Sequence, residues 1–360
     1  MRKNDIRVHV QLGYGFDAQV AKERYRRGET NDYTPYGFHL AECPGVAVRF
    51  SSDALGVPRN RLIHAVNNRL GFHIDHAWNN RRAIADADVV WTMSENEALA
   101  VAALMMLRVV PRRPIIGGAI WLFNNWDRMP RVRQALFRRL SGYIDVLTVH
   151  SAACLDVVAR ARLRTSVELS PFGINAELYT PLPQRPSPPV GPIHVLAAGN
   201  DRTRDWGTLL EAFGNDPRFI VSAWTPALNA ADTDRIGNLR LPKPPTNKAM
   251  LEMFADADVI VVPMFPNVFS GITVALEAAA LGRPVISSAT GGVPTYFSED
   301  EVLYVPTDDP AALREAALEA RTPRFAAMAA RAQARFGKGD YTTGAMIERY
   351  LALTARILRR

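Results

Sequence analysis

The sequence predicts an α/β fold made of two similar domains. Short apolar segments of strand type alternate with segments of helical periodicity along the chain, which is typical of parallel sheets covered by helices. The segment Ala85-Asp-Ala-Asp-Val-Val90 is echoed by Ala255-Asp-Ala-Asp-Val-Ile260, and each ends a helix and begins a strand. Six prolines between positions 181 and 192 separate the two series and indicate a stiff linker.

Length and composition support the same reading. A chain of 360 residues is long for one core, and 48% hydrophobic with 22% charged residues describes a folded globular protein. The apolar run 98–107 is far shorter than the roughly 20 residues of a membrane span, and the charged residues at 1–5 do not resemble a signal region. Cys43 and Cys154 lack metal-ligand spacing and suit a reducing cytoplasm.

The first series of elements occupies residues 1–182, the expected N-terminal domain. Apolar, β-branched runs predict its strands, and apolar residues at helical spacing predict its helices. The expected strands are 6–10, 46–50, 89–91, 114–116 and 146–149, and the expected helices are 98–107 and 151–162. The proline-rich linker follows at 183–192.

The second series occupies residues 193–340. Its expected strands are 193–198, 219–223, 259–262, 285–286 and 302–305, and its expected helices are 206–213, 248–255 and 310–320, with a further short helix before 282. Residues 341–360 predict a last amphipathic helix, which either crosses back to the N-terminal domain or lies on the surface.

The basic charge is concentrated in the first part of the chain. Residues 1–150 hold 21 Lys and Arg against 14 Asp and Glu, whereas residues 151–360 hold 22 of each. In segment 126–140 aromatic and aliphatic residues are interleaved with Arg128, Arg131, Arg133, Arg138 and Arg139. Such a segment suits an anionic membrane surface, or it is a solvated helix face whose apolar residues belong to the core. No nucleic-acid reader motif accompanies the charge, so we expect no nucleic-acid partner.

Residues 266–286 hold the strongest functional signal. They follow the apolar strand 259–262, open as a glycine-containing loop, continue as a helix and return to a strand. This arrangement places backbone N–H groups at a helix N-terminus, where they suit a phosphate. Glu277, farther along the helix, suits the hydrogen bonds of a ribose diol.

Three segments in order resemble glycosyltransferases of the GT-B fold, above all family 4 (glycosyl transferases group 1). They are 169–181, similar to the stretch that ends the N-terminal domain of that family, 195–213, similar to its strand, basic loop and helix, and the motif 266–286 with Pro263 ahead of it. The resemblance covers roughly 145–320. It implies two Rossmann-like domains facing an interdomain cleft.

The resemblance also implies the roles of two charged residues. Arg204 matches the family's lysine that contacts the donor diphosphate, and its planar, permanently charged guanidinium suits two phosphate oxygens. Glu277 matches the second acid of the family's Glu-x7-Glu pattern and is expected to hold the ribose. In the loop that Gly199 opens, Arg202 is either a helper at the phosphates or a solvated residue.

One departure from the family pattern concerns the donor sugar. The first acid would stand at position 269, where this chain has Phe269. We therefore expect the sugar hydroxyls to meet Ser270, Thr273 or the backbone N–H groups around Gly271 and Ile272. Family 4 enzymes retain the anomeric configuration, so the resemblance implies retention, although that inference leans partly on the missing acid.

In the N-terminal domain, Gly13-Tyr-Gly15 follows the first strand, where such enzymes present a glycine loop to the cleft; the alternative is a tight turn. An inverting reaction would need a carboxylate base, and Glu95 after the strand 89–91 is the first candidate. It is otherwise a helix-start glutamate favoured by the helix dipole. Other acceptor-side options are His39, His73 and His76.

Together these observations predict a metal-independent hexosyltransferase without a cofactor that uses a nucleoside-diphosphate sugar. We expect a carbohydrate acceptor, with a lipid-linked intermediate of surface polysaccharide or glycoconjugate synthesis explaining the basic segment, and action in the cytoplasm at the inner face of the plasma membrane. Two alternatives stay open: a GT-B sugar-nucleotide epimerase, and a non-catalytic nucleotide-sugar-binding partner of a polysaccharide assembly complex.

Overall fold

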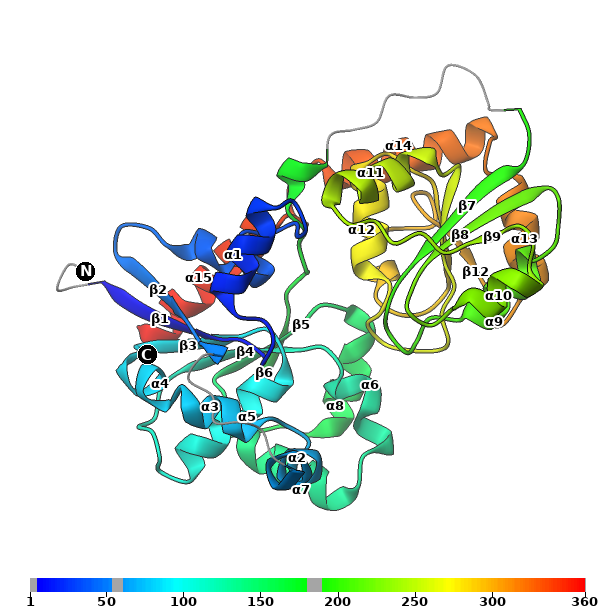
Figure 1. Ribbon diagram of the computed structural model, residues 1–360. Coiled ribbons are helices and arrows are strands. Elements are labelled where there is room, and N and C mark those ends of the chain that lie inside the picture. Colours follow the sequence, from blue (N-terminus) through cyan, green and yellow to red (C-terminus); the bar gives the residue numbers. More distant parts are fainter. Residues whose placement is uncertain (1–4, 54–60, 180–189, 360) are drawn as a thin grey trace. The chain divides into compact units, whose positions relative to one another are not determined.

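The computed structural model describes residues 5–53, 61–179 and 190–359, which form two compact units (Figure 1). Unit 1 comprises Met1–Pro171 and Thr343–Arg360, and unit 2 comprises Phe172–Thr342. Each unit is built around a six-stranded parallel sheet. The predicted α/β class with two Rossmann-like domains is therefore confirmed.

The sheet of unit 1 has the strand order β2-β1-β3-β4-β5-β6, and every pairing is parallel. Strands β3, β4 and β5 are buried along their whole length because helices cover both faces of the sheet. The chain leaves β1 toward β2 on one side and later returns to β3 on the other, so the direction of winding changes between β1 and β3. The strands are β1 (Ile6–Gln11), β2 (Val46–Phe50), β3 (Val89–Thr92), β4 (Ile115–Ala119), β5 (Val146–Val149) and β6 (Ser166–Leu169).

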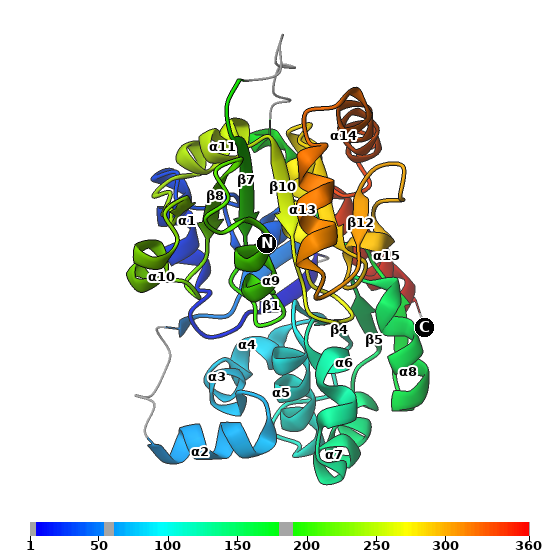
Figure 2. The ribbon, with the colours of Figure 1, turned by 90° about the vertical axis from the view of Figure 1, so that its right-hand side faces the viewer.

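Helices lie on both faces of this sheet, with α1 and α15 on one face and α3, α5 and α7 on the other (Figures 1 and 2). Ser94 begins α5 as its N-cap and accepts a hydrogen bond from the N–H of Asn96. The helices of unit 1 are α1 (Ala18–Arg26), η1 (Pro35–Ala41), α2 (Arg61–Leu70), α3 (Ile74–Asn79), α4 (Arg81–Asp86), α5 (Glu95–Met106), α6 (Leu122–Asn125), η3 (Trp126–Arg128), α7 (Arg131–Ser141), η4 (Ala152–Cys154), α8 (Leu155–Ala161) and α15 (Thr343–Leu358).

Helix α15 closes the core of unit 1 with buried aromatic contacts. The indole N–H of Trp91 donates to the Thr354 hydroxyl at 2.9 Å, and the Tyr350 hydroxyl donates to the Thr92 carbonyl at 3.2 Å. The rings of Tyr350 and Phe38 pack edge to face with centroids 5.4 Å apart. The last helix, which the sequence allowed to cross back, thus packs in unit 1.

The sheet of unit 2 has the order β12-β11-β10-β7-β8-β9, again with parallel pairings. Its first strand in the chain, β7, lies in the middle, and the direction of winding changes between β7 and β10. Ligands bind at such a point in open α/β sheets, beyond the carboxyl ends of the two strands. The strands are β7 (Ile193–Ala198), β8 (Phe219–Trp224), β9 (Leu239–Arg240), β10 (Val259–Val262), β11 (Val285–Ser288) and β12 (Leu303–Val305).

Two apolar layers cover the faces of this sheet. Helices α11, α12 and α14 contribute to one layer, and α9 and α13 contribute to the other. Side-chain caps begin α9, α11 and α13, where Asp205, Thr246 and Asp309 accept hydrogen bonds from backbone N–H groups. The helices are η5 (Ala176–Leu178), α9 (Trp206–Phe213), α10 (Ala230–Arg235), α11 (Asn247–Asp256), α12 (Ile272–Ala280), η6 (Val293–Thr295), α13 (Pro310–Leu318) and α14 (Pro323–Phe336).

The division between the units falls at Pro171, not at residue 182 as the sequence analysis placed it. The N–H of Phe172 donates to the Tyr296 hydroxyl at 2.6 Å, and Ile174 forms a β-bridge with Thr342. These contacts attach the segment after Pro171 to unit 2, although it precedes the linker. Most of the proline-rich linker expected at 183–192 lies outside the described residues.

The apolar residues of segment 126–140 belong largely to the core. Trp126, Phe137 and Leu140 are buried, and the Arg138 guanidinium lies over the Trp126 ring, 5.2 Å from its centroid. Only Val132 among the large apolar side chains of this segment is exposed, at 84%. The segment therefore offers no continuous apolar face to a membrane, and its surface character is that of its exposed arginines.

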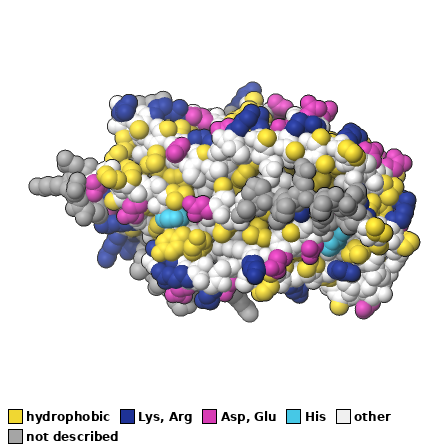
Figure 3. Space-filling view, turned by 90° about the horizontal axis from the view of Figure 1, so that it is seen from above, with side chains coloured by type: hydrophobic (Ala, Val, Ile, Leu, Met, Phe, Trp, Pro, Cys, Tyr) yellow, Lys and Arg dark blue, Asp and Glu magenta, His cyan; other side chains and the backbone are white. Residues whose placement is uncertain are grey.

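The face of the molecule that Figure 3 draws shows no single dominant charge. On the face drawn in Figure 3, lysine and arginine side chains are interspersed with aspartate, glutamate and hydrophobic ones. Within the described ranges, no helix has both the length and the apolar character to span a bilayer.

Candidate functional site

The loop after β10 leads into α12 and leaves that helix without a side-chain cap. The side-chain Oδ1 of Asn267 accepts hydrogen bonds from the N–H groups of Phe269 at 3.0 Å and Ser270 at 2.7 Å, which folds the loop tightly. Gly271 is the N-cap with a φ of 92°, a backbone conformation that favours glycine. Because the N-cap Gly271 offers no side chain to the first N–H groups of α12, these groups can bind the oxygens of an anion.

Arg204 lies in the neighbouring loop, which follows β7, and forms a β-bridge with Met264 in the loop after β10. Its side chain is only 5% exposed, and Nε is 3.2 Å from an Asp201 carboxylate oxygen. Nε is thus paired with Asp201, whereas Nη1 has no hydrogen-bond partner within the described part of the chain. Burial lowers the pKa of the guanidinium, but arginine stays charged at neutral pH. A buried cation with unused donors is suited to an anionic ligand.

Gly199 allows Arg204 to take this position. A Cβ atom added at residue 199 would stand 2.3 Å from Arg204 Nε and 3.0 Å from its Cδ. Any other residue would therefore displace the guanidinium. The glycine that opens the basic loop is explained by this close approach.

Asp201 joins the two loops. One of its carboxylate oxygens accepts the hydroxyl of Ser270 at 2.8 Å, and the other accepts the N–H of Thr203 at 2.9 Å. Burial acts to raise the pKa of Asp201, but the charge of Arg204 and these hydrogen bonds outweigh it and hold the pKa below its usual value. Asp201 is thus ionised and orients both Arg204 and Ser270.

Glu277 lies in the second turn of α12 and is buried. The Tyr179 hydroxyl donates to its Oε1 at 3.0 Å. Burial raises the pKa of Glu277 to about 7, while the Tyr179 hydrogen bond and the charge of Arg204 act in the opposite direction. A carboxyl in this state is stabilised as an anion when a ligand offers it further hydroxyl donors.

The other predicted residues of unit 2 surround these groups. Thr273 and Arg202 are exposed, Ile272 is buried at the start of α12, and Phe269 is partly buried. The structure thus places Gly199 against Arg204, links Ser270 to Arg204 through Asp201, and places Glu277 within electrostatic reach of Arg204.

The predicted residues of unit 1 take different positions. Gly15, with a φ of 93°, donates its N–H to Asp53 at 2.9 Å, so the loop after β1 is a fixed turn. The Glu95 carboxylate accepts the N–H groups of Ile120 at 2.8 Å and Trp121 at 3.2 Å. Glu95 therefore ties α5 to the loop after β4, and its role as a base stays a prediction.

The histidines proposed for the acceptor side are held by neighbouring polar groups. His39 Nδ1 lies 3.0 Å from the Thr34 hydroxyl, and His73 Nδ1 lies 3.2 Å from the side-chain amide of Asn67. His76 is buried, and its Nε2 lies 3.5 Å from Asp53.

Sequence reasoning missed three functional residues. Asp201 and Asn267 could have been found from the sequence, because aspartate and asparagine in loops often accept a hydrogen bond from the backbone N–H two residues later. Here the N–H groups of Thr203 and Phe269 are those donors. Tyr179 could not have been found in this way, since its contact with Glu277 spans 98 positions of the sequence. In the described residues, no group of three or more His, Cys, Asp or Glu is arranged to hold a metal ion.

A known protein family matches part of unit 2. Residues 223–322 match the family model described as "Glycosyl transferases group 1". A comparison with curated proteins finds no match. The match covers α12 and the loop before it, including Ser270, Gly271 and Glu277.

Solved structures resemble the whole chain. Sucrose-phosphate synthase from Thermosynechococcus elongatus superposes with a TM-score of 0.72 at 17% identity, covering 98% of this chain and 99% of that one. Anabaena HepE in complex with UDP and glucose gives 0.67 at 13%, covering 97% and 99%. A glycosyltransferase from Rickettsia africae gives 0.68 at 13%, covering 99% and 100%. The fold is GT-B, and the resemblance to group 1 is confirmed over the matched residues.

Proposed function

We propose that this chain, which has the GT-B fold and matches the group 1 family model in unit 2, is a glycosyltransferase that transfers a sugar from a nucleoside-diphosphate sugar to a carbohydrate acceptor. The observation that carries the proposal is the pairing of a buried, under-bonded Arg204 with the uncapped start of α12. Glu277 on the same helix completes the set, because its carboxyl suits the two hydroxyls of a ribose.

The chemistry follows from charge. When the glycosidic bond to the donor phosphate breaks, the electron pair stays with the departing nucleoside diphosphate, whose negative charge grows. The guanidinium of Arg204, a fixed cation, and the N–H groups of α12, fixed dipoles, stabilise that charge in a partly buried site. We therefore propose a reaction that needs no metal ion, which is tested by equal transfer rates with and without EDTA.

Position 269 is a phenylalanine and offers the donor sugar no carboxylate. In its place the sugar hydroxyls contact Ser270, whose own hydroxyl is held by Asp201. We propose retention of anomeric configuration from the group 1 resemblance, and NMR of the product anomer tests it. HepE, which was crystallised with UDP and glucose, makes UDP-glucose the first donor to try. The uridine preference itself is part of the proposal.

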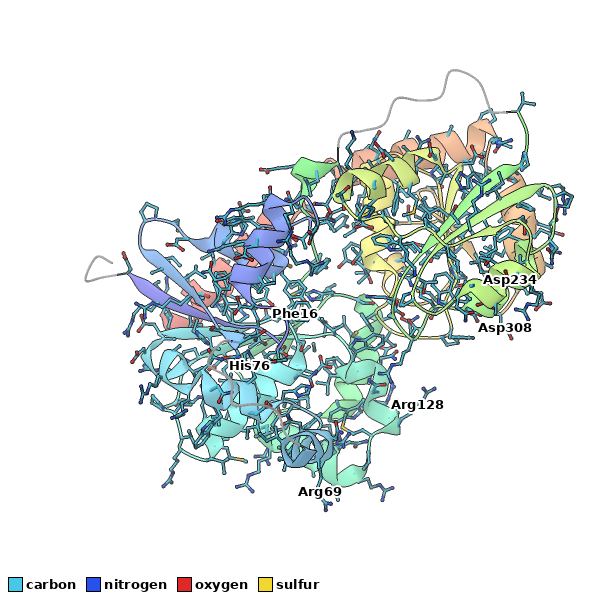
Figure 4. All side chains as sticks on the ribbon, viewed as in Figure 1. Phe16, Arg69, His76, Arg128, Asp234 and Asp308 are labelled. Carbon is cyan, nitrogen blue, oxygen red and sulfur yellow. The ribbon has the colours of Figure 1, made fainter. Side chains whose placement is uncertain are left out.

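The acceptor side of the proposal rests on unit 1. We propose a lipid-linked carbohydrate of surface polysaccharide or glycoconjugate synthesis, reached at the cytoplasmic face of a membrane through charge alone. The exposed arginines that support this contact are Arg128, Arg131 and Arg139, whereas Arg133 and Arg138 donate to backbone carbonyls. Figure 4 shows Arg69 and Arg128 extending from this part of unit 1.

Vesicle binding tests the membrane contact. Reversal of Arg128, Arg131 and Arg139 to Glu should abolish sedimentation with anionic phosphatidylglycerol vesicles, because each arginine near such a surface contributes about 1 kcal/mol. The matched control reverses three exposed arginines of unit 2 and should leave sedimentation intact: Arg240, Arg324 and Arg331. Sedimentation that survives the unit 1 reversal refutes the membrane contact.

Donor binding tests the central claim. Arg204→Ala should weaken UDP-glucose binding by about 1.5–3 kcal/mol, the usual effect of a lost charged hydrogen bond, and Arg324→Ala should not. Arg324 is an appropriate control because it forms only an exposed ion pair with Glu319. Unchanged donor affinity in Arg204→Ala would remove Arg204 from the site.

A second variant separates donor binding from folding. Thr273 is exposed in the first turn of α12, so Thr273→Asp should stabilise the helix through its dipole by about 0.3–1 kcal/mol. The same carboxylate should repel the donor phosphates. Loss of donor binding with an unchanged or higher melting temperature supports the site, whereas unchanged donor binding contradicts it.

Simple incubations distinguish the two alternative functions, the epimerase and the non-catalytic binding partner. Incubation with UDP-GlcNAc alone, followed by NMR, would reveal epimerisation, which requires no acceptor. A non-catalytic binding partner would bind the donor without hydrolysing or transferring it at any protein concentration. Transfer that is lost in both Arg204→Ala and Glu277→Ala excludes that partner role.

A further inference from the structure

The point where winding changes direction in the sheet of unit 1 lies between β1 and β3, which are paired in parallel from Val8 and Val89 onward. The loops after these two strands diverge beyond their carboxyl ends, where open α/β sheets form ligand-binding crevices. The loop after β1 contains Gly13 and Phe16, and β3 leads into the first turn of α5, which carries Glu97.

The carboxyl of Glu97 lies directly against the backbone of Gly13. A Cβ atom added at residue 13 would stand 3.1 Å from Glu97 Oε1 and 3.6 Å from Phe16 Cδ2. The carboxyl group and the phenyl ring therefore meet around this glycine. The Ser94 hydroxyl donates to Glu97 Oε2 and fixes the orientation of the carboxyl.

Glu97 is not neutralised by a basic residue. Among the described residues, none with a Lys or Arg side chain pairs with it, and no cation is among the influences on its charge. Burial raises its pKa to about 7, and the negative charge of Glu95 adds to that effect. Glu97 is only partly buried, and a poorly compensated carboxyl of this kind beside an exposed loop is a candidate functional site.

An aromatic surface stands beside this carboxyl. Phe16 is 51% exposed and stacks on Tyr36, with centroids 6.1 Å apart and ring planes 20° from parallel. Figure 4 shows Phe16 in the loop that follows β1. Tyr36 has a φ of 59°, a left-handed conformation that is costly for a tyrosine by about 1–2 kcal/mol. Such strain is concentrated at ligand sites.

The charge of Glu97 also acts on the Tyr36 hydroxyl. Burial and, to a smaller extent, the charge of Glu97 together raise the pKa of Tyr36 to about 12. Its hydroxyl is therefore protonated at neutral pH. The strained backbone at Tyr36 thus keeps an aromatic ring near both Phe16 and Glu97.

We propose that Phe16, Tyr36 and Glu97 form a binding site for one uncharged pyranose ring of the acceptor. A sugar ring has a face of C–H groups and an edge of hydroxyls. The Phe16–Tyr36 surface suits the apolar face, and the Glu97 carboxylate accepts hydrogen bonds from the hydroxyl edge. An acidic sugar would be repelled by Glu97. This inference rests on the proposed function for the identity of its ligand as an acceptor.

Binding of simple glycosides tests the site without the acceptor's full structure. The probes are the methyl glycosides of glucose, galactose, mannose and N-acetylglucosamine, with methyl glucuronide as the acidic probe, each observed by saturation-transfer NMR. We expect signal from at least one neutral glycoside with the unaltered protein, and a tenfold or greater loss of affinity in Phe16→Ala and Glu97→Gln. Absence of signal from all neutral glycosides, or binding unchanged in both variants, overturns the proposal.

Matched variants separate this site from the donor site and from misfolding. Trp78 is another exposed aromatic of unit 1, so Trp78→Ala should leave glycoside binding unchanged. Gly13→Ala should reduce glycoside binding because its methyl group would press on Glu97. Phe16→Tyr keeps an aromatic ring and should retain the glycoside binding that Phe16→Ala loses. The variants Phe16→Ala, Glu97→Gln and Trp78→Ala should each bind UDP-glucose within twofold of the unaltered protein. Glycoside binding without UDP-glucose binding in the unaltered protein would refute the proposed function and leave this site standing.

Discussion

The pKa of Glu277 predicts that donor binding depends on pH. In the free protein, burial holds this carboxyl half-protonated near pH 7, and Tyr179 and Arg204 are the groups that favour its ionised form. Ribose hydroxyls would add two more donors to the ionised form only. The donor should therefore bind the ionised protein and displace the proton.

The magnitude follows from the linkage between protonation and binding. With a pKa of about 7, roughly nine-tenths of the free protein carries the proton at pH 6 and one-tenth carries it at pH 8. The dissociation constant for the donor should consequently rise about tenfold from pH 8 to pH 6, or about 1.4 kcal/mol. At pH 7 binding should release about half a proton per donor molecule.

Isothermal titration calorimetry measures both quantities. UDP-glucose is a better titrant than UDP, because its phosphates are both esterified and do not titrate in this range. Repeating the titration at pH 7 in two buffers of different ionisation enthalpy counts the protons released. Glu277→Gln is the control, since it keeps the shape of the side chain and has no proton to lose.

Two results would refute the reasoning. One is an affinity that is the same at pH 6 and pH 8 with no proton release. The other is a pH dependence that persists unchanged in Glu277→Gln, which would assign the titrating group elsewhere.

Three further predictions concern single contacts. Tyr179→Phe should raise the midpoint of the pH dependence by about one unit, because it removes a hydrogen bond to the ionised carboxylate worth about 1.5 kcal/mol; an unmoved midpoint contradicts the role of Tyr179. Gly199→Ala should lower donor affinity at least tenfold by displacing Arg204, while calorimetry that finds full affinity would show that the guanidinium position is unimportant. Thr354→Val should cost about 1–3 kcal/mol of unfolding free energy in urea because the Trp91 indole N–H loses its acceptor, and donor binding should be unaffected.

Sequence patterns predicted the elements that a buried core dictates. The run Val259–Val262 is a strand because a parallel sheet covered on both faces needs apolar residues at every position. The sequence patterns did not predict the edge strand β6 (Ser166–Leu169) or the surface helix α1 (Ala18–Arg26). Strand β6 is partly polar and half-exposed, and α1 buries little besides Ala18. Their structure depends on neighbours, so periodicity carried little signal.

The donor site shows the same limit. Arg204 and Glu277 were found because each stands in a local motif of loop and helix. Asp201 and Tyr179 act on those residues from distant loops, so only the folded chain reveals them. Conversely, Glu95 had a plausible position by sequence, but its two backbone hydrogen bonds to the loop after β4 were invisible there.

The return of α15 to unit 1 has a consequence for how the protein is made. The hydrogen bond from Trp91 to Thr354 joins residues 263 positions apart in the sequence. Unit 1 therefore cannot complete its core until all of unit 2 has been translated. Unit 2 is continuous in sequence and has no such delay. During synthesis the nascent N-terminal sheet would therefore expose the apolar surface around Trp91 and Phe38, which is a period of aggregation risk. Chaperone dependence should accordingly be greater for the first half of the chain than for the second.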